Sequence, residues 1–81
     1  MTYEKLLTIA LRGLKAFKKS AKQFSNYQFR RATVYESSGL DGNLIHALFG
    51  FEICDEHGEN YHEITISATP ENWVVIGVKR I

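Results

Sequence analysis

The chain has 81 residues, enough for one folded domain over residues 1–81 but too few for a large core. Its 44% hydrophobic and 12% aromatic residues exclude a disordered chain, and its single cysteine, Cys54, excludes an internal disulfide framework. The net charge of +1 conceals a division, because residues 1–31 sum to +7 and residues 32–81 sum to −6. Such a division bears on partners and association rather than on fold.

The N-terminal segment predicts a helix over residues 3–24, because its apolar residues recur at the i, i+3, i+4, i+7 spacing of one helix face. These apolar positions are Tyr3, Leu6, Leu7, Ala10, Leu14, Phe17, Ala21 and Phe24. Thr2 is suited to cap the helix, Gly13 is a mild cost inside it, and Ser25 and Asn26 are suited to end it.

The same segment does not have the pattern of a signal peptide, since charges interrupt its apolar residues and no small-residue cleavage site follows. No apolar run approaches the roughly 18 residues that a bilayer span requires. With a single cysteine, which fits a reducing compartment, we expect a cytoplasmic protein, of a cell or of an infected host cell, without a membrane partner.

Beyond the helix the apolar period changes to two, which predicts four strands at 27–36, 44–54, 60–68 and 73–81. Turn residues separate them at 37–43, at His57-Gly58 and at 70–72. Short connections make neighbouring strands antiparallel. The predicted fold class is therefore α+β, with one N-terminal helix packed on one face of a four-stranded antiparallel β-meander.

The strand register follows from the apolar pattern. If His57-Gly58 is a turn, residues whose numbers sum to 115 face each other, which pairs Phe51 with Ile64 on one face. For the last hairpin a sum near 142 extends the same face. The predicted sheet core is Ala47, Phe49, Phe51, Ile64, Ile66, Val74, Ile76 and Val78.

The first strand leaves two arrangements open, and both place an arginine near the core. In one, Arg31 points inward together with Tyr27, Phe29, Thr33 and Tyr35. In the other, Arg30 points inward together with Ala32 and Val34.

The cationic residues of the helix fall opposite its apolar stripe and should face solvent. They are Lys5, Arg12, Lys15, Lys18, Lys19 and Lys22. A solvated face is the ordinary explanation of such a run. However, Lys15–Lys19 and Lys18–Lys22 are like-charge i,i+4 pairs that each cost roughly 0.2–0.5 kcal/mol, which indicates an external anionic partner.

The predicted outer face of the sheet places Glu52 opposite Glu63, which is unfavourable unless it is compensated. The same register puts Leu48, Trp73 and Val75 nearby, as an apolar patch rimmed by acid that is typical of an interaction surface. Alternatively, Trp73 folds over the sheet edge, or an arginine of the first strand pairs with Glu52.

No motif indicates catalysis or a cofactor. The one cluster with metal-ligand side chains has poor spacing; it comprises Cys54, Asp55, Glu56, His57, His62 and Glu63. Cys54 lacks a histidine base within reach on the expected hairpin, and no glycine-rich loop is followed by a helix and lysine. We therefore expect no enzyme activity, no metal and no cofactor.

The layout resembles that of cystatins and nuclear transport factors, although no family motif is present and the strand that precedes the helix in cystatins is missing. The small size, patchy charge and lack of catalytic motifs are similar to those of inhibitors that phages and mobile elements encode. This resemblance implies a small binding protein.

We expect a non-catalytic module that binds an acidic surface of another protein, acts as an inhibitor, and also forms a homodimer. The expected contact residues are Arg12, Lys15, Lys18, Lys19, Lys22, Leu48, Trp73 and Val75. The alternative is a nucleic-acid-associated protein that uses the same cations on phosphates. A third hypothesis is a small ligand held between helix and sheet.

Overall fold

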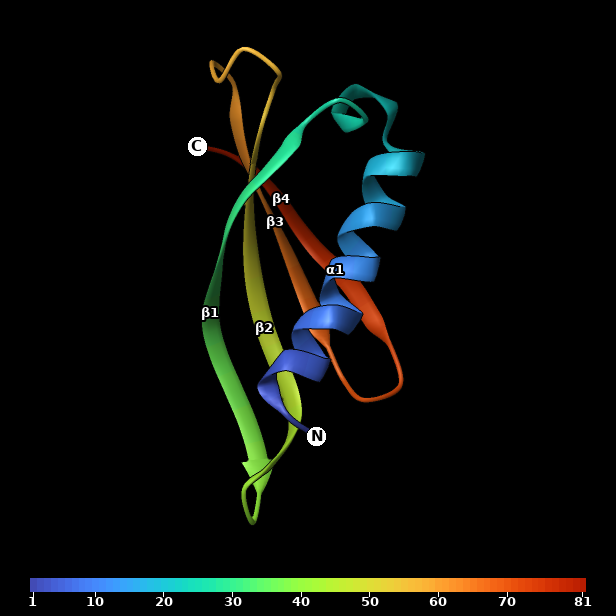
Figure 1. The fold of residues 1–81 in the computed structure, drawn as a ribbon, viewed down its shortest axis with the longest axis vertical. Coiled ribbons are helices and arrows are strands. Elements are labelled where there is room, and N and C mark those ends of the chain that lie inside the picture. Colours follow the sequence, from blue (N-terminus) through green and yellow to red (C-terminus); the bar gives the residue numbers. More distant parts are fainter.

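The computed structural model describes all residues, 1–81 (Figure 1). A helix, α1 (Tyr3–Ser20), and a short 3₁₀ turn, η1 (Lys22–Phe24), precede four strands: β1 (Gln28–Leu40), β2 (Asn43–Cys54), β3 (Tyr61–Ala68) and β4 (Trp73–Arg80). The strands form one antiparallel sheet in the order β1-β2-β3-β4, and α1 packs against β2, β3 and β4. The predicted α+β fold class is confirmed.

The helix begins as predicted and ends four residues earlier. The Thr2 hydroxyl accepts the backbone N–H of Lys5 at 3.3 Å, which caps the first turn. Ala21 leaves the helical conformation, and η1 then turns Phe24 back into the core. There the Phe24 ring lies 5.8 Å from that of Phe17 and 4.8 Å from that of His62, so aromatic packing favours the turn over a longer helix.

The core lies between α1 and the middle of the sheet. The helix contributes Leu6, Ala10 and Leu14 to it, and the sheet contributes mainly β2 and β3. The β2–β3 register has the predicted sum of 115, with Phe51 opposite Ile64. Both residues are fully buried, so the predicted inward face of these two strands is confirmed.

The last strand departs from its predicted register. Val78 lies opposite Ile64 as expected, but an irregularity beside Thr65 places Val75 rather than Ile76 opposite Ile66. Val74, Ile76 and Val78, which were predicted in the core, are 52%, 57% and 46% exposed. That part of the core prediction is wrong. The extra residue exchanges the faces of the strand toward its start, which turns Val74 outward, whereas Val78 keeps its predicted place opposite Ile64 and is exposed there.

The shift turns Trp73 toward the helix. Trp73 and Val75 are partly buried and pack against the core. A Cβ atom built on Gly13 of α1 would lie 2.8 Å from Cδ2 of the Trp73 ring. Gly13 therefore lets the indole approach the helix backbone closely, which explains a glycine in the middle of α1.

Replacing Gly13 with alanine is expected to lower the free energy of unfolding by about 1–3 kcal/mol, because the new methyl group overlaps the indole. At an open helix position the same change would raise stability by about 1 kcal/mol. Urea unfolding of Gly13→Ala, with and without Trp73→Leu, measures the difference. A gain in stability with Trp73 intact would contradict this packing.

The first hairpin is longer than predicted. Strand β1 continues to Leu40, and Asp41 and Gly42 form the turn with φ values of 52° and 82°. Positive φ at both central residues is the geometry that two-residue hairpin turns favour. The predicted loop at 37–43 is therefore mostly strand, with Leu40 opposite Asn43.

Bulges resolve the open question of β1. Ala32 and Val34 lie opposite Phe51 and Phe49 and so share their face, as one arrangement predicted. Arg30 does not join them, because it is skipped in the pairing and is exposed. Neither arginine of β1 is buried.

Candidate functional site

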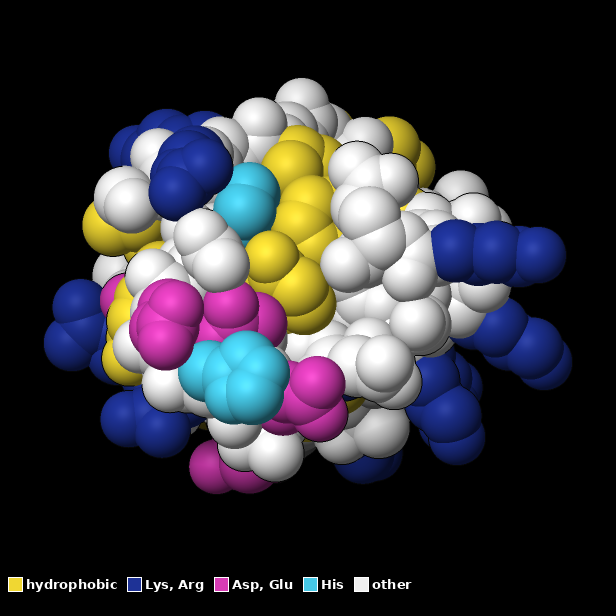
Figure 2. All heavy atoms as spheres, turned by 90° about the horizontal axis from the view of Figure 1, so that it is seen from above, with side chains coloured by type: hydrophobic (Ala, Val, Ile, Leu, Met, Phe, Trp, Pro, Cys, Tyr) yellow, Lys and Arg dark blue, Asp and Glu magenta, His cyan; other side chains and the backbone are white.

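The helix cations project into solvent without a carboxylate partner. The protein contains one salt bridge, Arg31–Glu52 at 3.7 Å, and His57 lies 3.9 Å from Glu56; neither contact involves α1. In Figure 2, which looks down on the end with the β2–β3 loop, lysine and arginine side chains project on the helix side and also on the opposite side, and acidic side chains gather near the loop. No cation of α1 therefore forms a salt bridge with a carboxylate of the chain.

Three of these cations border a groove along the C-terminal half of α1, here named the lysine groove. It is lined by Leu11, Leu14, Lys15, Lys18, Lys19 and Ser25 and has a volume of about 560 Å³. Leu14 is buried and Leu11 is partly buried, so two leucines supply an apolar wall. Lys15 and Lys19 are exposed and Lys18 is half-buried, so the ammonium groups are available beside that wall.

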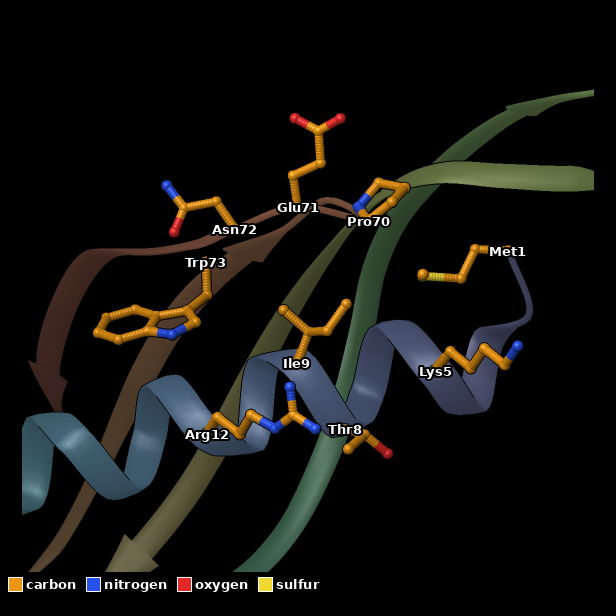
Figure 3. Close-up of a pocket in the computed structure, with 9 residues that line it drawn as sticks. All are labelled: Met1, Lys5, Thr8, Ile9, Arg12, Pro70, Glu71, Asn72 and Trp73. Atoms are coloured by element: carbon orange, nitrogen blue, oxygen red, sulfur yellow. The ribbon is translucent and has the colours of Figure 1, made fainter.

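A second hollow, the Trp73 pocket, lies between the N-terminal half of α1 and the β3–β4 turn and has a volume of about 440 Å³. Figure 3 shows Ile9 and Arg12 on the helix and Trp73 at the start of β4 around it, with Pro70 in the turn. Lys5 adds a second cation at the N-terminal end of the pocket.

The contact residues predicted on the helix therefore lie at different places in the structure. Lys15, Lys18 and Lys19 line the lysine groove, Arg12 lines the Trp73 pocket, and Lys22 is exposed in η1 and lines neither. Sequence reasoning missed Leu11 and Ser25 as lining residues. The i,i+4 spacing of Leu7, Leu11 and Lys15 was the available signal for Leu11, whereas nothing in the sequence brings Ser25 to the helix.

The predicted apolar patch on the outer sheet face does not form. Trp73 and Val75 face the helix because of the irregularity in β4, and only Leu48 lies on the outer face, half-buried opposite Ser67. The alternative in which Trp73 folds over the sheet edge is wrong as well, because the indole packs against Gly13 of α1. The alternative in which an arginine of the first strand pairs with Glu52 is confirmed by Arg31.

The outer face is also less acidic than the sequence division suggested. Glu52 and Glu63 do lie opposite each other, as predicted. However, Arg31 lies 3.7 Å from Glu52, and the Tyr35 hydroxyl donates a hydrogen bond to Glu63. That hydrogen bond raises the pKa of Tyr35. Since Lys79 pairs opposite Glu63, charges of both signs occupy this face.

The β2–β3 loop is built around Asp55. Its carboxylate accepts the backbone N–H of Glu59 at 2.9 Å, that of His57 at 3.1 Å and the side-chain amide of Asn60 at 2.6 Å. These donors, the Glu59 N–H foremost, lower the Asp55 pKa to about 2. No group of three His, Cys, Asp or Glu side chains is close enough to hold a metal ion, so this carboxylate is a loop anchor.

Asp55 is expected to make the folded state more acid-sensitive. Its pKa is lowered on folding, so its stabilising effect is complete above the unfolded value of 3.8 and is lost as the pH falls toward about 2. Urea unfolding of the wild type and of Asp55→Ala between these pH values tests this expectation. The wild type should lose stability more steeply than the variant, and parallel curves would contradict it.

The centre of the helix–sheet interface is filled, because Leu6 and Ala10 on α1 and Phe49 and Phe51 on β2 are fully buried. The lysine groove lies along α1, and the Trp73 pocket lies where α1 meets the β3–β4 turn. No helix of the structure combines the length and apolar character needed to cross a bilayer. Comparison with protein families, curated proteins and solved structures finds no match, so function is argued from this geometry.

Proposed function

We propose that this protein is a non-catalytic binding module that holds an acidic, partly apolar segment of another protein in the lysine groove. One observation carries the proposal: Lys15, Lys18 and Lys19 have no carboxylate partner in the chain and stand beside the apolar wall of Leu11 and Leu14. Because the like-charge pairs on α1 weaken the free helix, bound carboxylates would relieve a cost that the isolated protein bears.

The spacing of the lysines specifies the shape of the partner. Residues four apart on a helix are separated by a rise of about 6 Å, so Lys15 and Lys19 suit two carboxylates at that distance. Glutamates at i,i+4 of a helix have this spacing, and acidic residues at i,i+2 of a strand, about 6.6 Å apart, come close to it. Leucine or phenylalanine on the adjoining face would contact Leu11 and Leu14.

The groove favours a protein segment over a nucleic acid. Sequence-independent binding of single strands combines cations with aromatic rings on which bases stack. No aromatic side chain lines the lysine groove, and Phe17 of α1 instead stacks with Phe24. A phosphate backbone would also leave the leucine wall in contact with water, whereas an apolar side chain would cover it.

Covering an acidic surface blocks its other ligands, so the proposal includes an inhibitory role. A reducing compartment such as the cytoplasm suits the module, whose single cysteine is buried.

Fluorescence anisotropy with three labelled probes tests the proposal. The probes are a helical peptide with glutamate at i,i+4 and leucine on the adjoining face, the same peptide with serine for leucine, and single-stranded oligothymidine. The leucine peptide should bind at least about tenfold more tightly than either other probe. Equal binding of the two peptides, tighter binding of the oligonucleotide, or no binding of the leucine peptide would overturn the proposal.

A further inference from the structure

The free edge of β1 is the longest unpaired backbone in the molecule. Strand β1 has 13 residues, all exposed except Ala32, and α1 does not pack against it (Figure 1). Phe29 is 47% exposed although it lies opposite the fully buried Ile53, and Val34 is 37% exposed opposite Phe49. A long edge strand with exposed apolar side chains is a template for pairing with another strand.

Two of the three irregularities in the β1–β2 pairing are symmetric about Thr33, and the third, between Ser38 and Gly39, skips Ile45 of β2 and lies outside this central segment. The pairing with β2 skips Arg30 and Tyr35, so the two bulges span Arg30–Arg31 and Tyr35–Glu36. A two-fold rotation about Thr33 exchanges these two segments. In an antiparallel β1–β1 pair each bulge would therefore face a bulge of the partner strand, and the ladder would stay in register on both sides of the axis.

Charge selects the same register. With Thr33 opposite Thr33 of a second copy, Arg30 of each chain lies opposite Glu36 of the other, and symmetry gives two such pairs. Shifting the partner strand by two residues along β1 removes these charge pairs. Glu36 then lies opposite Ala32 for a shift in one direction and opposite Gln28 for a shift in the other. Shifts of one residue would place the inner face of one strand beside the outer face of the other.

We propose that a second copy of this chain pairs with β1 in this register, forming a two-fold dimer with one continuous sheet across both copies. Each copy presents the same strand, as an isologous interface requires. Phe29 and Val34 then lie beside the partner strand, and both helices lie on the same face of the joined sheet. The dimer interface contains no residue of the lysine groove. A result that refutes the dimer would therefore leave the proposed function unaffected.

Sedimentation equilibrium of the wild type and three charge variants tests the interface. Arg30→Glu alone and Glu36→Arg alone each place like charges opposite one another twice, and each should raise the dimer dissociation constant by about tenfold or more. The double variant, Arg30→Glu with Glu36→Arg, restores opposite charges and should return the constant close to the wild-type value. A monomeric wild type would overturn the proposal. So would a double variant that dimerises more weakly than both single variants.

Disulfide cross-linking tests the register independently. Cysteine at position 33 faces its own copy across the axis, so Thr33→Cys should form a covalent dimer under mild oxidation. Ser38→Cys is the matched control, because position 38 is exposed on the same strand but lies five residues from the axis. The native Cys54 is buried, so wild type should remain uncross-linked. Cross-linking through position 38 as readily as through position 33 would exclude this register.

Discussion

Replacing Phe49 with alanine is expected to lower the free energy of unfolding by about 3–5 kcal/mol, because it removes a whole aromatic side chain from a packed core. Phe49 is fully buried, and its ring lies 5.7 Å from that of Phe51 and 5.8 Å from that of Tyr3. It therefore joins β2 to the first turn of α1. A domain of this size has roughly 4–12 kcal/mol of stability in total, so the loss is large.

Urea unfolding followed by far-ultraviolet circular dichroism measures the loss. Ile76→Ala is the matched control, because Ile76 is apolar but 57% exposed, and its truncation should cost less than about 1 kcal/mol. The sequence pattern alone would have placed both residues in the core. Equal costs for the two variants would contradict the β4 register described above.

Reversing two charges of the lysine groove is expected to abolish most binding of the leucine peptide. Lys15→Glu with Lys19→Glu turns two attractive contacts into repulsive ones, and at about 1 kcal/mol per contact this raises the dissociation constant by roughly 30-fold. Positions 15 and 19 remain a like-charge i,i+4 pair in this variant, and each new carboxylate has a lysine three residues further on, Lys18 or Lys22, so α1 is expected to stay folded.

The control is Lys5→Glu with Lys22→Glu, which makes the same change in net charge on residues that do not line the groove. Fluorescence anisotropy at two salt concentrations separates a local effect from a general one. The control should weaken binding by less than about threefold at the higher salt, where distant charges are screened. Equal losses for both double variants would mean that net charge, and not the groove, determines binding.

The apolar alternation predicted the register correctly in strands of which only one face is apolar. It failed in the strand of which both faces are apolar. In β2 and β3, moving the register by one residue would bury Glu52 and Glu63, so the pattern specified the observed pairing. In β4, Trp73 and Val75 are as apolar as Val74 and Ile76, so alternation cannot choose between the two faces. The choice depends on the space above Gly13, which only the packed helix reveals.

The charge division along the chain predicted the cations of α1 that lack a carboxylate partner. It overstated how far basic and acidic residues are separated in the folded protein. Arg31 belongs to the basic part of the sequence, yet the structure places it beside Glu52 on the outer sheet face. The groove itself could be predicted only in part. Helix periodicity places Lys15, Lys18 and Lys19 together, whereas Ser25 reaches them because the chain turns at Ala21, a feature without a sequence signal.

The most direct test of the binding account is the titration of ¹⁵N-labelled protein with the leucine peptide, followed by amide chemical shifts. The account predicts that the largest shift changes fall on Leu11, Leu14, Lys18 and Ser25, with little change along the outer face at Glu52 or Thr65. Changes concentrated on the outer face, or spread evenly over every lysine and arginine, would contradict it.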